Sequence, residues 1–145
     1  MKRREKIEIP LKLVELENEN YHILVEIGFS DNKTGMWVID TGASKTVLDI
    51  NLIDYYTKVE TPLTETESMG IGDSRIETSS GIVHEMKFGS TTIFDLSVAL
   101  IDLSPLNVLY HQFTNEKITG LIGSDFLVRS KAIIDFKKRV LIFTI

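Results

Sequence analysis

Asp40 is the residue of this sequence best placed to do chemistry. It ends the apolar run GMWVID (35–40), and the turn-forming residues TGAS (41–44) follow it before apolar residues return. A strand buried on both faces would hold the carboxylate still and remove part of its water. Gly42 allows a positive φ or a close backbone approach, so its N–H can point back at that carboxylate. The pattern therefore predicts one rigid carboxylate with no cation beside it.

A single carboxylate of this kind is a poor catalyst, whereas two that face each other are a good one. They do not both ionise when they are close, so one holds a proton and the other is a base. The base can then activate a water while the acid protonates a carbonyl. The sequence contains one D-T-G, at 40–42, so a dyad requires a second subunit across a two-fold axis. The last segment, RVLIFTI (139–145), reads as an uncovered apolar edge that a second copy would cover, which also favours a homodimer.

The elements that must position Asp40 are mostly β-strands, because apolar and polar residues alternate along most of the chain. The helix signals are fewer: SPLNVLYHQF (104–113) has Ser104 as N-cap and Pro105 at the first helical position, and a short helix capped by Ser124 follows a strand and a glycine. Residues 47–56 are ambiguous between a strand and a short helix. The segments that read as strands are 6–16 and 21–29 as an antiparallel pair, 35–40, 75–78, 81–89, 91–103, and 132–136 with 139–145 as a closing hairpin.

Composition narrows the class of protein. The 145 residues fit one domain, 1–145, with 43% hydrophobic and 26% charged residues. A net charge of −5 argues against a nucleic-acid partner, and the absence of cysteine excludes a disulfide, a thiolate zinc site and a cysteine nucleophile. No segment approaches the roughly 18 apolar residues of a membrane helix, and acidic residues interrupt the basic opening too often for a signal peptide. We therefore expect a cytoplasmic protein with no membrane partner.

The three histidines offer no metal site. His22, His84 and His111 lie on separate predicted elements, with no spacing typical of metal ligands. We therefore expect neither a metal nor another cofactor.

Three blocks of the sequence together resemble the retropepsin-type aspartic proteases, the single-lobed, homodimeric branch of the pepsin-like proteases. The blocks are VIDTGAS (38–44), MGIGDSRIETSSGIVHEMKFG (69–89) and GLIGSDFL (120–127), and the resemblance spans residues 21–145. It implies an all-β, retropepsin-like acid-protease barrel, a single lobe with one or two short helices. It also implies an aspartic endopeptidase with Asp40 as the catalytic residue and a peptide or protein as substrate. The strand pair at the N-terminus and the helix at 104–113 exceed the viral layout, which favours a cellular, bacterial relative.

The resemblance assigns two further groups of residues. Active-site support falls on Thr41, Gly42, Ala43 and Ser44, with Thr41 interlocking with its twin across the dimer, and a substrate-binding flap falls on Met69, Gly70, Ile71 and Gly72. Ala43 replaces the serine of pepsin-like enzymes, which implies activity at a milder pH. Retroviral enzymes commonly carry an Asp–Arg ion pair at positions 44 and 124. Here both positions are serine, so we expect a hydrogen bond in its place.

Two other functions fit the same residues. One is a catalytically silent module that keeps the fold and the peptide groove but has lost hydrolysis. The other is a dimerisation module in which Asp40 only caps a turn. Asp40→Asn separates them, because a protease loses turnover but keeps its dimer and its peptide binding, whereas a scaffold loses at most a little stability.

Overall fold

The computed structural model describes residues 5–60 and 79–145, which form β-strands with two short α-helices, as the sequence predicted. The predicted flap, Met69 to Gly72, and the predicted strand at 75–78 lie outside the described residues. The elements are β1 (Lys6–Pro10), β2 (Lys12–Glu17), β3 (Asn20–Gly28), β4 (Thr34–Ile39), β5 (Val47–Asp49), the 3-10 turn η1 (Ile53–Tyr55), β6 (Tyr56–Val59), β7 (Ser79–Phe88), β8 (Thr91–Ile101), α1 (Ser104–Phe113), β9 (Ile118–Ile122), α2 (Ser124–Arg129), β10 (Ile133–Asp135) and β11 (Val140–Thr144).

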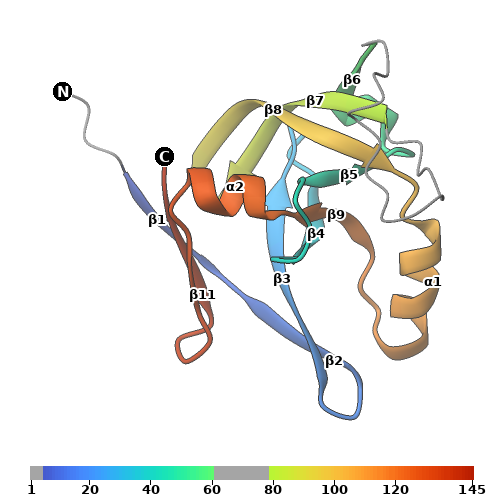
Figure 1. Cartoon of the computed structure of the whole chain (residues 1–145), viewed down its shortest axis with the longest axis vertical. Helices are drawn as coiled ribbons and strands as arrows, with labels where there is room; N and C mark the ends of the chain where they lie inside the picture. The colour runs from blue at the N-terminus through green and yellow to red at the C-terminus, as the bar shows by residue number, and fades with distance from the viewer. Residues whose placement is uncertain (1–4, 61–78) are drawn as a thin grey trace.

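The larger of two sheets has the strand order β2-β3-β4-β9-β5-β8-β7-β6. A further pairing between β3 and β7, at Gly28 and Lys87, curls this sheet toward a barrel. In Figure 1 the long β7–β8 pair lies above β4, β5 and β9. The ambiguous segment 47–56 is divided between strand β5, the turn η1 and the start of β6. The all-β barrel expected from the sequence is confirmed.

β4 lies inside this sheet, antiparallel to β3 and parallel to β9. Trp37, in the middle of β4, is fully buried and packs over Gly120 of β9. A Cβ added at Gly120 would lie 2.2 Å from Cζ3 of Trp37, so only glycine allows this close approach. Residues 37–39 are all buried, which confirms the expected strand with two buried faces. β4 therefore delivers the chain rigidly to Asp40.

The C-terminal strand is covered by the chain itself, contrary to the expectation of an exposed edge. β11 is the middle strand of the second sheet, whose order is β1-β11-β10. The register pairs Ile7 with Phe143 on one side and Ile134 with Leu141 on the other. Sequence reasoning missed this because β1 and β11 are separated by almost the whole chain. The argument for a dimer from this strand is wrong, and the edges of this sheet are β1 and β10.

Three aromatic rings join the second sheet and α2 to the barrel. Phe88 of β7, Phe126 of α2 and Phe143 of β11 are buried, and the centroids of their rings lie 5.2 to 5.6 Å apart. Aromatic pairs in stacked or edge-on contact contribute about 0.5 to 1.5 kcal/mol beyond the burial of their surface. This cluster fixes α2 beneath the strand ends that carry the candidate site.

The helix α1 begins at Ser104, and Pro105 lies in its first turn as expected. The N-cap position is Leu103, not Ser104, and no side chain caps the helix. Ser104 instead donates from its N–H and its hydroxyl to Asp102 Oδ1, at 3.0 and 2.6 Å. Asp102 is therefore the residue that fixes the start of α1. The sequence prediction gave this role to Ser104, two residues later.

One face of α1 is pinned to the large sheet. Asn107 is buried on this face and bonds both ways with Ile118, donating to its carbonyl at 2.9 Å and accepting from its N–H at 2.7 Å. Its side-chain amide thus pairs with the first residue of β9 as a neighbouring strand would. Tyr110, one turn further along, is fully buried against β2 and β3 residues such as Val14 and Leu24. α1 therefore packs on the sheet in a fixed orientation.

Candidate active site

Asp40 sits where β4 ends and a tight turn begins. Its N–H donates to the carbonyl of Ile122 in β9 at 2.9 Å, so the backbone is still held by the sheet at this residue. Its carbonyl accepts from the N–H of Ala43 at 3.1 Å, which closes the turn. Its carboxylate Oδ1 accepts from the N–H of Gly42 at 3.0 Å, and the side chain is half-buried. Backbone hydrogen bonds to β9 before the turn and within the turn therefore fix the position of the Asp40 carboxylate.

Gly42 acts through close approach rather than through a positive φ. The only described glycine with a positive φ is Gly89, in the turn between β7 and β8. A Cβ added at Gly42 would come 3.3 Å from Asp40 Oδ1, which is a tight contact with the oxygen that the Gly42 N–H binds. A side chain at position 42 would therefore push the carboxylate from its donor. Of the two reasons that the sequence suggested for this glycine, the structure supports the second.

The segment before α2 lies directly beneath the Asp40 turn. The N–H of Ser124 donates to the carbonyl of Ala43 at 2.8 Å. Gly123 passes so close to the chain that an added Cβ would lie 2.5 Å from the backbone carbon of Lys45. The cap position of α2 is Gly123 rather than the predicted Ser124, so Ser124 serves the site through its backbone. Position 124 is thus linked to the Asp40 turn through the carbonyl of Ala43.

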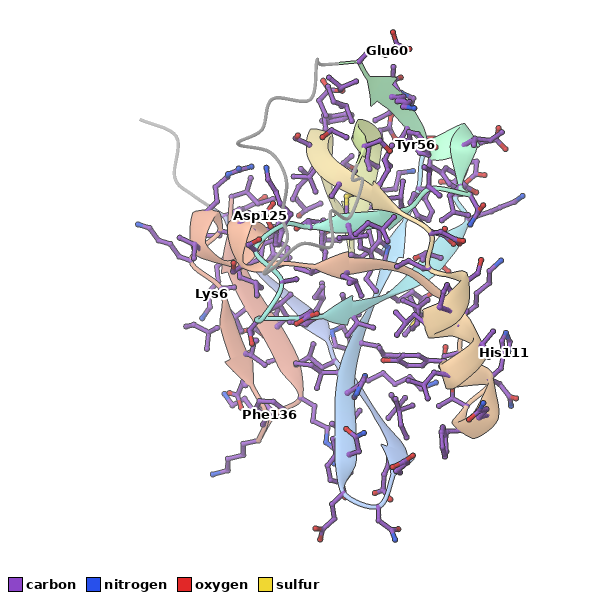
Figure 2. The ribbon with its side chains drawn as sticks, turned by 45° about the vertical axis from the view of Figure 1, so that its right-hand side comes forward. Lys6, Tyr56, Glu60, His111, Asp125 and Phe136 are labelled. Atoms are coloured by element: carbon purple, nitrogen blue, oxygen red, sulfur yellow. The ribbon has the colours of Figure 1, made fainter. Side chains whose placement is uncertain are left out.

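A buried threonine completes the link between the two segments. The Thr46 hydroxyl donates to Asp125 Oδ1 at 2.8 Å and accepts from the N–H of Gly123 at 3.1 Å. The Thr46 N–H donates to the same Asp125 oxygen at 2.9 Å. Thr46 is completely buried, and Figure 2 shows Asp125 at the start of α2 beside this turn. Asp125 is therefore a structural acceptor for the Asp40 turn.

No ion pair of Asp40 is found within residues 5–60 and 79–145. The ion pairs found there are Lys6 with Glu8 and Lys12 with Glu116, both away from the turn. The pKa of Tyr110 in α1 is raised to about 12. Burial is the larger cause, and the charge of the Asp40 carboxylate is the second. The buried Tyr110 phenol is therefore neutral and lies near enough to Asp40 for the carboxylate charge to influence it.

The predicted site residues divide into two groups in the structure. Asp40, Thr41, Gly42, Ala43 and Ser44 form one continuous turn, in which Thr41, Gly42 and Ser44 are exposed and Ala43 is half-buried. The flap residues lie outside the described part of the chain.

Sequence reasoning missed Thr46 altogether, although its position between the predicted strand at 35–40 and the apolar segment 47–56, close to the D-T-G turn, could have marked it. Over residues 5–60 and 79–145, no three His, Asp or Glu side chains gather as metal ligands would. Neither described helix is long and apolar enough to cross a bilayer.

Comparison with known proteins places this fold and turn in a family. The sequence model of the family described as aspartyl protease matches residues 25–126, which takes in the strand β4, the Asp40 turn and the first half of α2. The chain therefore belongs to the aspartyl protease family.

Among solved structures, the chain is similar to a retropepsin-like aspartic protease from Rickettsia conorii. The TM-score is 0.51 at 16% sequence identity, and the alignment covers 98% of this chain and 92% of that one. At this identity the likeness concerns the fold, which is retropepsin-like. None of the curated proteins compared with the sequence matches it.

Proposed function

We propose that this protein is an aspartic endopeptidase that works as a homodimer, with Asp40 of each subunit forming the catalytic dyad. The observation that carries the proposal is the Asp40 turn itself, in a chain of the aspartyl protease family. Its carboxylate is half-buried, ends a rigid strand, and accepts from the N–H of Gly42 at 3.0 Å. This is a carboxylate built for a fixed position and left accessible to a ligand.

The need for a second copy follows from the chemistry. Two carboxylates close together share one proton, so one is an acid and the other a base at the same pH. The sequence supplies one D-T-G, and Asp125, the other carboxylate close to the turn, is already bonded to Thr46. The twin Asp40 is therefore the natural partner. Thr41, exposed beside Asp40, would contact its own twin, and the second sheet offers the edges of β1 and β10 for further contacts.

The reaction would proceed by direct attack of water on the peptide bond. The ionised Asp40 removes a proton from the water, whose oxygen attacks the carbonyl carbon, while the protonated Asp40 of the other subunit gives its proton to the carbonyl oxygen. The tetrahedral intermediate collapses when the peptide nitrogen takes the proton now held by the first Asp40 and the C–N bond breaks, while a hydroxyl of the intermediate returns a proton to the second Asp40. Neither a covalent enzyme intermediate nor a cofactor is required. The substrate is an extended peptide, over which Met69, Gly70, Ile71 and Gly72 would close as a flap.

The test is cleavage of a diverse peptide pool at several pH values, with products identified by mass spectrometry. Asp40→Asn should abolish every cut while leaving the dimer and the folded state intact. Asp54→Asn, a matched change at an exposed aspartate of η1, should leave the cuts unchanged. Cuts that persist in Asp40→Asn would refute the proposal. A stable dimer that binds peptides but does not cut at any pH would identify a silent peptide-binding module instead.

A further inference from the structure

His22 lies near the start of β3, the strand next to β4, whose last residue precedes Asp40. The antiparallel register of β3 and β4 pairs Leu24 with Val38, and the same register, continued by two residues past the end of β4, sets His22 opposite Asp40. The chain at Asp40 is still extended, since its N–H bonds to Ile122 of β9. Residues directly opposite in an antiparallel pair point to the same face, with Cβ atoms about 5 Å apart. Any peptide seated at Asp40 therefore passes within reach of His22.

Tyr110 holds the His22 ring from the inner side. Nδ1 of His22 and the Tyr110 hydroxyl lie 2.6 Å apart, and the two rings meet edge to face with centroids 5.6 Å apart. Tyr110 is fully buried, and burial together with the charge of Asp40 raises its pKa to about 12, so its phenol stays neutral at working pH. Because Nδ1 faces this buried partner, Nε2, on the far side of the half-buried ring, faces outward.

The charged groups around His22 leave this outward nitrogen to a ligand. Lys12, on the neighbouring strand β2, is paired with Glu116. His111, next to Tyr110 in α1, is exposed and lies on the outer side of the helix (Figure 2). Asp40, across the sheet, accepts from Gly42. His22 is thus a polar side chain, anchored at one nitrogen and presented at the other, beside the candidate catalytic carboxylate.

We propose that His22, held by Tyr110, is a substrate-positioning residue whose Nε2–H donates a hydrogen bond to the side chain of the peptide beside the scissile bond. The inference rests on the proposed function, because it places a substrate at Asp40. When the phenol donates to Nδ1, the neutral ring carries its proton on Nε2. Nε2 is then the donor that the ring presents to a ligand. The matching ligand is an acceptor oxygen, as in Gln, Asn, Glu or Asp.

Two substitutions separate positioning from a merely structural role. The amide nitrogen of glutamine can reach the place of Nε2, whereas asparagine can replace only Nδ1. His22→Gln therefore keeps the outward donor, and His22→Asn keeps the bond to Tyr110. Binding is measured with Asp40→Asn as the background, which needs no turnover, using peptides from the cleavage screen that differ only by Gln, Glu or Leu at each position. The matched control is His111→Asn, which changes the residue next to Tyr110 in α1.

His22→Asn is expected to weaken binding of the Gln peptide about 3- to 10-fold, which is the net effect of one hydrogen bond, and to leave the Leu peptide unchanged. His22→Gln should restore most of the loss, and His111→Asn should have no effect. In the active enzyme the same change should appear in KM rather than in kcat.

Other results would contradict the role of His22 or the proposed function on which it rests. If His22→Asn keeps full binding, or binds better than His22→Gln, the ring only supports Tyr110 and the inference is wrong. If the peptides bind to all variants equally, the proposed protease stands and the role of His22 falls. If the parent protein neither cuts nor binds any peptide, the proposed function fails and this inference fails with it.

Discussion

The hydroxyl of Thr46 is expected to be the largest single polar contribution to the stability of the Asp40 turn. Thr46→Val keeps the shape of the side chain but removes the oxygen that donates to Asp125 at 2.8 Å and accepts from the N–H of Gly123 at 3.1 Å. The lost bond to a carboxylate contributes about 1.5 to 3 kcal/mol, and the buried N–H left without an acceptor adds about 1 to 3 kcal/mol. Since the two terms overlap, we expect a loss of about 3 kcal/mol.

A loss of this size is easily measured in a chain of 145 residues. At roughly 3 °C per kcal/mol, the melting temperature should fall by about 9 °C. Urea unfolding followed by circular dichroism gives the free energy directly, provided that the protein concentration is fixed, because dimer formation would make stability depend on concentration. Turnover should fall as well, since Thr46 ties the Asp40 turn to the segment before α2.

The control is Thr46→Ser, which keeps the hydroxyl and loses only a methyl group. It should cost about 1 kcal/mol, the effect of one buried methylene-sized group. If Thr46→Val lies within about 0.5 kcal/mol of the parent protein, the hydrogen bonds of Thr46 contribute nothing and the reasoning is refuted. If Thr46→Ser is as destabilised as Thr46→Val, packing rather than the hydroxyl holds the turn.

Two further outcomes follow from the same structure. Gly120→Ala should abolish soluble, folded protein or cost more than about 3 kcal/mol, because its Cβ would lie 2.2 Å from the Trp37 ring and 2.6 Å from the Val47 carbonyl; normal unfolding curves for this variant would contradict the packing. The pKa of Tyr110 is raised in the folded state to about 12, against about 10 in the unfolded chain, so the unfolded state loses its proton first and stability should fall as pH rises from 10 through 12. Urea midpoints measured across that range should fall less steeply in Tyr110→Phe, and an equal slope in both proteins would show that another group is responsible.

Local sequence pattern was enough to predict the elements around the Asp40 turn. The apolar run before Asp40 predicts a strand buried on both faces, because each of its residues has to leave water whichever way it points. The bond from the Gly42 N–H to the carboxylate could also be expected, since its two ends are two residues apart. Pro105 predicted the start of α1 to within a residue, because its fixed φ suits the first helical turn.

Contacts between distant segments could not be predicted in this way. Thr46 and Asp125 are 79 residues apart, and His22 and Tyr110 are 88 apart, so no short pattern contains both members of either pair. Each pair meets only because β9 enters the sheet between β4 and β5, or because α1 packs over β2 and β3. The error about β11 has the same origin, since its partner β1 lies at the other end of the chain.

The sequence by itself therefore determined the class of the fold, the place of Asp40 at a strand end, and the turn that follows it. These depend on hydrophobic period and turn chemistry, which act over a few residues. Only the tertiary structure decided which strand covers β11, which side chain ties the Asp40 turn to α2, and which ring of α1 meets His22. Choosing among distant partners depends on the packing of the whole core against the entropy of closing long loops, and no local segment carries that information.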